Sequence, residues 1–289
     1  MRNTMKRYRE RRGARVCGPL FTAALVVATL ACSEESIAPA ATHYRDDEPR
    51  VCVALPGAAG RHDEEHTPGG IRYRVRTPAN YDAAVAHPLL LVYPGAGHSS
   101  AASERHTGLT PAATAAGFIV AYADHRRLSL PVLDDLATIP AAIAARWCVD
   151  PGRMYVTGHS DGGTAAAAMA FRADDGFTPS GIAPSAAGIN ADDLAAYDCP
   201  QPLPVIILHS ADDKLFPGFG RSAAQWWAGC NRCATTTHAT HDDCVEFDRC
   251  PEHAPVRYCE GDGSHRRWPA RNATLLQFLR DVAVADADD

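Results

Sequence analysis

Residues 153–163 constrain the fold of this chain more than any other stretch, and they read Arg-Met-Tyr-Val-Thr-Gly-His-Ser-Asp-Gly-Gly. Residues 154–156 are strand-forming, and the alanine-rich run 165–171 favours a helix. Between them lies a G-x-S-x-G sequence centred on Ser160. We therefore predict a strand that turns sharply into a helix, with Ser160 at the tip of the turn.

A serine in this position is suited to act as a nucleophile. A strained backbone at Ser160 projects the hydroxyl above the sheet, while Gly158 and Gly162 let the strand and the helix pass closely. The N-terminus of the helix directs N–H groups toward an oxygen that becomes negative during acyl transfer. An ordinary glycine-rich turn is the alternative interpretation of these residues.

A serine nucleophile of this kind needs a carboxylate and a histidine, which follow it along the chain in that order. The apolar run 203–208 predicts a core strand, and the loop after it contains Asp212 and Asp213, either of which can be the acid. A later short strand is followed by His265 in a glycine-rich loop. The candidate catalytic residues are therefore Ser160, His265 and one of the two aspartates.

An oxyanion hole would complete this chemistry. The apolar run 88–93 predicts an early core strand, and it ends in the sequence Pro-Gly-Ala-Gly at residues 94–97. Glycines there allow the backbone to turn an N–H group inward. We expect the backbone N–H groups of Ala96 and Asp161 to be the two donors, with a plain strand-to-loop turn as the alternative.

These segments resemble the secreted feruloyl esterase and polyhydroxybutyrate depolymerase group of α/β-hydrolases. The leading pattern of that group, y-x-v-x-x-P-x-x-Y, is matched at residues 73–81. Its pattern C-V-D-x-x-R-v-y-v-T-G-x-S-x-G-G is matched at residues 148–163. Its acid segment, H-G-x-x-D-x-x-V-P, is matched at residues 209–217, and this match places the acid at Asp213 rather than Asp212.

The resemblance spans residues 50–282 and implies an α/β-hydrolase fold, with a mainly parallel central sheet flanked by helices and a cysteine-rich insertion before the catalytic histidine. The alternation of predicted strands and helices independently favours such a sheet. Two departures from the group stand out. Pro94 replaces the usual histidine before the oxyanion glycine, and an extra residue separates His265 from Trp268.

Eight cysteines lie beyond the N-terminal segment, and an even number in an exported chain indicates disulfides. The resemblance favours three pairs and leaves the fourth by remainder. These pairs are Cys52 with Cys148, Cys230 with Cys259, Cys244 with Cys250, and Cys199 with Cys233.

The same insertion allows a second interpretation. Cys230 and Cys233 are followed by His238, His241 and Cys244, a spacing that zinc could accept. We expect disulfides and no metal, because the N-terminus indicates export.

The N-terminus is predicted to be an export signal. A basic segment precedes the apolar run 16–31, which is too short to span a membrane comfortably. Residues 29–32 resemble a bacterial lipobox, with Cys32 as the lipidated residue, and ordinary secretion is the alternative. The predicted organisation is a signal peptide at 1–31, a tether at 32–48, a catalytic domain at 49–282 and an acidic tail at 283–289.

Composition limits the partners. The net charge is −6 and the basic residues are concentrated in the first fifteen positions, so no basic stripe for nucleic acid is expected. We expect a monomer with an ester substrate and no cofactor. This monomer is expected to contact a membrane only through the lipid anchor.

The resemblance implies an exported serine esterase that acts on feruloyl, acetyl or other short aryl or alkyl esters of plant polysaccharide. Trp268, Trp227 and Tyr93 are the predicted substrate contacts. A short-chain polyester depolymerase is the alternative substrate class. A peptidase or acyltransferase, or a non-catalytic surface-anchored binding module, is the alternative from another class.

Overall fold

The structure is a computed structural model, and it describes residues 52, 55–172 and 177–285. The predicted signal peptide, the lipidation site Cys32 and the tether lie outside the described residues. The predicted catalytic domain from residue 49 to 282 falls almost entirely within them. Across the described part of the chain, no helix is long and apolar enough to cross a bilayer.

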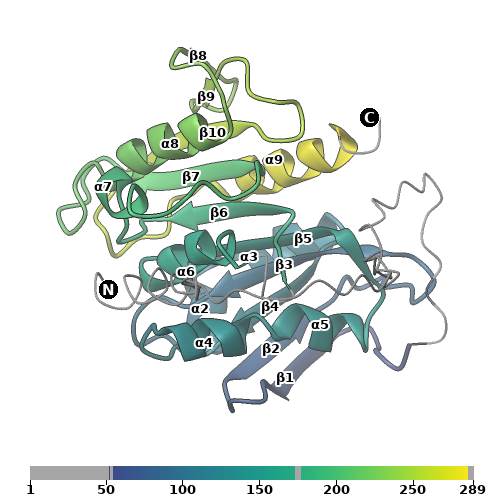
Figure 1. Ribbon diagram of the computed structural model, residues 1–289. Coiled ribbons are helices and arrows are strands. Elements are labelled where there is room, and N and C mark those ends of the chain that lie inside the picture. The colour runs from purple at the N-terminus through teal and green to yellow at the C-terminus, as the bar shows by residue number, and fades with distance from the viewer. Residues whose placement is uncertain (1–51, 53–54, 173–176, 286–289) are drawn as a thin grey trace, which may run out of the picture.

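A ten-stranded sheet forms the centre of the molecule, in the order β1-β2-β4-β3-β5-β6-β7-β10-β9-β8 (Figure 1). From β4 to β10 in this order, every neighbouring pair is parallel, while β1, β2, β8 and β9 add antiparallel edges. The predicted mainly parallel sheet is thus confirmed. The strands are β1 Arg61–His66, β2 Arg72–Arg76, β3 His87–Tyr93, β4 Ile119–Ala123, β5 Val149–His159, β6 Gly181–Ser185, β7 Val205–Ser210, β8 Thr237–Ala239, β9 Val245–Phe247 and β10 Val256–Gly261.

Helices cover both faces of this sheet, as predicted. Strand β3 shows why, since Leu89 and Leu91 belong to one buried cluster and Leu90 and Val92 to the other. The first cluster contains residues of α4 to α8, and the second contains residues of α3 and α9. The helices are α2 Ser100–Thr107, α3 Leu109–Ala115, α4 Leu130–Leu136, α5 Ile139–Ala144, α6 Asp161–Met169, α7 Ala191–Leu194, α8 Phe219–Cys230 and α9 Asn272–Ala285.

The last helix, α9, ends at Ala285 and so includes the first three residues of the segment predicted to be an acidic tail from residue 283. Leu275, Phe278 and Leu279 are buried on the face that packs against the sheet, so the apolar side of this helix agrees with its sequence pattern.

Four disulfides join all eight cysteines of the described chain. Cys52 bonds to Cys148 as predicted, but the other three predicted pairings are wrong. Strand register explains one of the errors: Tyr258 of β10 lies opposite Val245 of β9, which brings Cys259 to Cys244, with their Cα atoms 4.3 Å apart. The observed pairs are Cys52–Cys148, Cys199–Cys230, Cys233–Cys250 and Cys244–Cys259.

These bonds also remove the arrangement on which the zinc alternative depended. Cys230, Cys233 and Cys244 are each bonded to another cysteine, so none offers a thiolate. His238 instead lies 2.7 Å from Asp248 through its Nδ1 atom. The predicted cysteine-rich insertion is therefore a disulfide-linked segment around β8 and β9.

Candidate active site

The G-x-S-x-G sequence forms the predicted strand, turn and helix. Ser160 joins β5 to α6 with φ 57° and ψ −118°, a conformation that is strained for a residue with a side chain. A Cβ atom at Gly162 would clash with the backbone of Tyr93, and one at Gly163 with that of Ser185. The Ser160 N–H donates to the Ser185 carbonyl at 2.9 Å. Neighbouring strands thus hold the serine in its strained conformation.

The three predicted catalytic residues are in contact. Nδ1 of His265 lies 2.7 Å from Oδ2 of Asp213, and its Nε2 lies 2.9 Å from Oγ of Ser160. Ser160, Asp213 and His265 follow β5, β7 and β10, which are parallel strands. Because the carboxyl ends of parallel strands meet at one edge of a sheet, residues far apart in the chain converge there.

Asp213 is held as an ionised acceptor. It is 2% exposed, and its Oδ1 accepts hydrogen bonds from the N–H groups of Leu215 at 2.9 Å and Phe216 at 3.0 Å. Burial alone would raise the pKa of Asp213, but these amides and His265 outweigh it and hold that pKa below its usual value. Asp212 is exposed, so the structure supports the register that selected Asp213.

His209 is a residue of this site that sequence reasoning missed. It is 2% exposed, and its Nε2 donates to the Phe216 carbonyl at 2.9 Å while lying 3.5 Å from Oδ2 of Asp213. Burial lowers the pKa of His209, so the ring stays neutral at neutral pH. Its signal in the sequence was its place four residues before the acid, and it secures the loop that carries Asp213.

The loop predicted to supply the oxyanion hole passes beside the serine. A Cβ atom at Gly95 would lie 3.3 Å from the carbonyl oxygen of His159, so this loop and the turn at Ser160 are neighbours. The φ of 75° at Gly97 and the hydrogen bond from His98 N–H to the Gly95 carbonyl form a tight turn. In the described chain the Ala96 N–H has no hydrogen-bond acceptor.

The second expected donor belongs to α6. Asp161 is the first residue of this helix, and the N–H groups at the start of a helix have no acceptor within it. Its side chain contacts Nε2 of His125 through Oδ2 at 3.1 Å. Neither backbone N–H group thus has a backbone acceptor within the described chain.

Two of the three predicted substrate contacts are wrong. Trp227 and Tyr93 are each 1% exposed, because both belong to the buried cluster that contains residues of α4 to α8. Trp268 is half-buried: its indole N–H donates to Asn272 and its ring lies 6.1 Å from that of His159. Trp268 thus packs behind the site and does not line the cavity in front of it.

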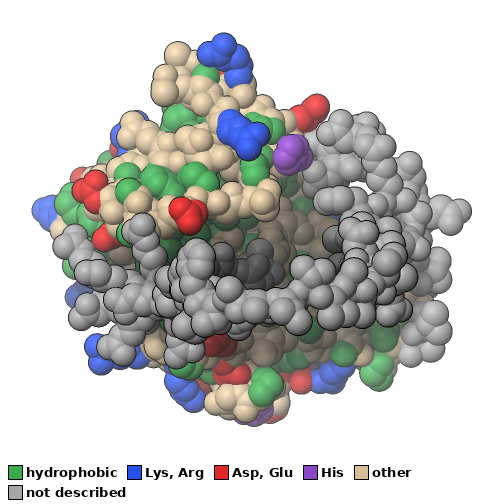
Figure 2. All heavy atoms as spheres, viewed as in Figure 1, with side chains coloured by type: hydrophobic (Ala, Val, Ile, Leu, Met, Phe, Trp, Pro, Cys, Tyr) green, Lys and Arg blue, Asp and Glu red, His purple; other side chains and the backbone are tan. Residues whose placement is uncertain are grey.

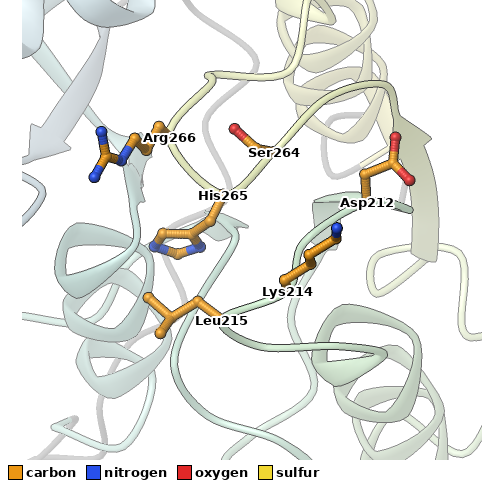
Figure 3. Close-up of a pocket in the computed structure, with 6 residues that line it drawn as sticks. All are labelled: Asp212, Lys214, Leu215, Ser264, His265 and Arg266. Atoms are coloured by element: carbon orange, nitrogen blue, oxygen red, sulfur yellow. The ribbon is translucent and has the colours of Figure 1, made fainter.

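An open cavity of about 520 Å³ lies in front of His265 (Figure 3). Leu215 is 60% exposed there and gives the cavity an apolar patch. Within the described chain, Lys214 and Arg266 have no carboxylate partner. The lining residues are Asp212, Lys214, Leu215, Ser264, His265 and Arg266. Figure 2 shows charges of both signs scattered over the uncovered part of the face in view, without a continuous basic stripe.

Comparison with known proteins places this geometry in a fold family. No family model matches the chain. A solved acetyl xylan esterase from Aspergillus awamori superposes with a TM-score of 0.60 at 12% identity, over 78% of this chain and 100% of that one. The S-formylglutathione hydrolase FrmB of Staphylococcus aureus does so with a TM-score of 0.54 at 13% identity, over 78% and 98%. The chain has the α/β-hydrolase fold.

One curated protein is also similar in sequence. NocK of Nocardia uniformis subsp. tsuyamanensis, whose name assigns it an inferred esterase activity, is 35% identical over 153 residues. That match covers 47% of this chain and 43% of NocK, so this chain spans less than half of the length of NocK.

Proposed function

We propose that this protein is a serine carboxylic-ester hydrolase. The observation that carries this proposal is the hydrogen-bonded series from Asp213 through His265 to Ser160, with the serine on a strained turn at the N-terminus of a helix. The similarity to NocK and to solved esterases agrees with it. A non-catalytic binding module would have no need to keep these three side chains in register.

The geometry supports acyl transfer through a covalent intermediate. Nε2 of His265 accepts the proton of the Ser160 hydroxyl as its Oγ attacks an ester carbonyl, and Asp213 stabilises the imidazolium that forms. The carbonyl oxygen becomes negative and accepts hydrogen bonds from the N–H groups of Ala96 and Asp161. In comparable sites each such donor stabilises the transition state by roughly 3 kcal/mol. The imidazolium then protonates the departing alcohol.

The second half of the reaction releases the acid. His265 takes a proton from water, which attacks the acyl–Ser160 carbonyl, and the same two N–H groups stabilise the oxyanion again. The proton returns to Ser160 as the carbon–oxygen bond breaks. All proton transfers use side chains that the fold already holds in contact, so the proposed reaction needs no cofactor.

For the substrate we favour feruloyl, acetyl or other short aryl or alkyl esters carried on plant polysaccharide. The cavity beside His265 is open and has polar and charged side chains around Leu215, which suits a small ester on a large hydrophilic carrier. The same exposed Leu215 could contact a hydroxybutyrate oligomer, so a short-chain polyester is the second candidate.

Export to an oxidising compartment is part of the proposal. Four disulfides in a chain of this size are typical of exported proteins. Lipid attachment at Cys32 remains a separate proposal, and mass spectrometry of the N-terminal peptide from membranes of the native host would test it.

The test is hydrolysis of an ester series by wild type and by Ser160→Ala. The series contains p-nitrophenyl esters of rising chain length, methyl ferulate, acetylated xylan and a hydroxybutyrate oligomer. We expect Ser160→Ala to lose all measurable hydrolysis with its melting temperature nearly unchanged. Ser264→Ala is the matched control, because it removes a hydroxyl from the same cavity and should stay active. Full activity in Ser160→Ala would refute the proposal.

A further inference from the structure

His159, the residue before the candidate nucleophile, reaches the loop of the candidate base. It is 6% exposed, and its Nε2 lies 2.6 Å from the backbone carbonyl oxygen of His265, 106 residues later in the chain. A carbonyl oxygen only accepts hydrogen bonds, so Nε2 carries the proton. Nδ1 lies 3.1 Å from Oγ of Ser185 and, in a neutral ring, accepts from that hydroxyl.

We propose that His159 is a positioning residue, whose Nε2–H fixes the backbone of His265 so that its imidazole reaches Ser160 and Asp213 together. This inference rests on the proposed function, because it assigns His159 a part in the same reaction. His159 directly precedes Ser160, and its side chain holds the residue that must accept the Ser160 proton. One side chain thus links the placement of nucleophile and base.

The loop that carries His265 needs such a contact. Its neighbours Ser264, Arg266 and Arg267 are exposed, and the loop makes a turn in which Arg267 N–H donates to the Ser264 carbonyl. The His265 ring itself meets the edge of Phe216, with centroids 5.0 Å apart. A displacement of about 1 Å in a reacting group can cost on the order of 100-fold in rate, so a fixed backbone matters here.

The surroundings of His159 keep its two nitrogens in these roles. Burial lowers the pKa of His159 to about 4, despite the opposing effect of its bond to the His265 carbonyl. The ring is therefore neutral during turnover and does not add positive charge beside the imidazolium of His265. The rings of His106, at 5.1 Å between centroids, and Trp268, at 6.1 Å, pack against it.

Two substitutions distinguish the contribution of Nε2 of His159 from that of Nδ1. In His159→Gln the side-chain amide can place an N–H where Nε2 was, whereas in His159→Asn the shorter amide reaches only the position of Nδ1. We expect His159→Asn to lower kcat on the order of 10- to 100-fold with little change in KM. His159→Gln should recover most of that loss. His106→Gln is the control, because it alters the neighbouring ring without a bond to His265.

A readout that needs no turnover comes from proton NMR. The proton between His265 Nδ1 and Asp213 should give a resonance far downfield in wild type, in His106→Gln and in His159→Gln. In His159→Asn it should broaden or disappear, because the loop moves and the proton exchanges with water. Melting temperature and circular dichroism show that each variant is folded.

The outcomes are distinct. Loss of kcat and of the resonance in His159→Asn, with recovery of both in His159→Gln, supports positioning. The inference is overturned if His159→Asn keeps both, or if the two variants are equally impaired while folded. If wild type hydrolyses no ester of the series, the proposed function fails, yet the NMR comparison still decides whether His159 places His265.

Discussion

The two sides of the candidate active site are built in different ways. On the nucleophile side, Ser160 is the single residue between the end of β5 and the start of α6, and β5 lies in the middle of the sheet. Close backbone contacts at Gly162 and Gly163 hold this turn in place. On the other side, Asp213 and His265 lie on loops after β7 and β10. The chain around those loops is held by disulfides near the edge of the sheet.

Two cross-links tie elements on the acid–histidine side to neighbouring segments. Cys244–Cys259 ties β10, which leads to His265, to the segment before β9, and Cys199–Cys230 ties the end of α8 to the approach to β7. A nucleophile can be placed by a short stretch of backbone. A carboxylate and an imidazole that belong to separate loops need long-range constraints as well.

The largest expected effect is on the acid. Asp213→Asn should lower kcat by about 10³- to 10⁴-fold, because an amide cannot hold the His265 tautomer that accepts the serine proton. Asp212→Asn is the matched control on the adjacent exposed residue and should change kcat little. Steady-state kinetics on a p-nitrophenyl ester decides between them. A larger loss in Asp212→Asn would show that the acid has been misassigned.

The nucleophile side should be the more sensitive to backbone crowding. In Gly162→Ala the added methyl group would meet the carbonyl oxygen of Tyr93. We therefore expect the free energy of unfolding to fall by about 1–3 kcal/mol or more, as is typical of overpacking, and ester hydrolysis to be severely reduced. Gly152→Ala, on the strand β5 that precedes α6, places its Cβ 3.4 Å from Asp150 and should be tolerated. Urea unfolding and ester hydrolysis measure both effects. Equal behaviour of the two variants would contradict the close contact at Gly162.

The contrast between the two sides also explains what the sequence could predict. The strand, turn and helix around Ser160 come from one contiguous pattern, and Asp213 came from a short resemblance after the β7 strand. Three disulfide pairings were wrong because they depend on the register of β9 and β10 and on the position of α8, which no local pattern encodes.

Burial was hard to predict for a related reason. Both faces of β3 are covered, so alternation along the strand could not show that the side chain of Tyr93 belongs to the core. His159 is part of the G-x-S-x-G sequence, but its role could not be predicted from that pattern. Its partner is a backbone carbonyl 106 residues away, and every residue has such a carbonyl, so the sequence does not indicate which one it binds.

Disulfide removal should separate stability from activity. Serine pairs replacing Cys52–Cys148 or Cys244–Cys259 open loops of 96 and 15 residues, and such losses typically cost about 2–5 kcal/mol, more for the longer loop. Cys52–Cys148 should therefore matter more for melting temperature and Cys244–Cys259 more for kcat. Alkylation without reductant should label none of the eight cysteines in wild type. The reverse ranking of kcat would show that the acid–histidine side does not depend on its cross-link.

The smallest effect concerns acid stability. The folded pKa of Asp213 lies below its unfolded value of about 3.9, so the carboxylate stabilises the fold fully above that pH. This contribution is lost as the pH falls through the folded pKa. Melting temperatures from pH 6 down to pH 3 should therefore fall less steeply in Asp213→Asn than in wild type. Parallel curves would indicate that the carboxylate gains no net stabilisation from its hydrogen bonds.

Covalent labelling tests most directly whether Ser160 is an activated nucleophile. An organophosphonate that mimics the acyl-transfer intermediate should add once to wild type, and peptide mass spectrometry should place the adduct on Ser160. Ser160→Ala should stay unlabelled, and His265→Ala should react far more slowly. An adduct on any other residue, or a wild-type protein that remains unmodified while folded, would contradict the account.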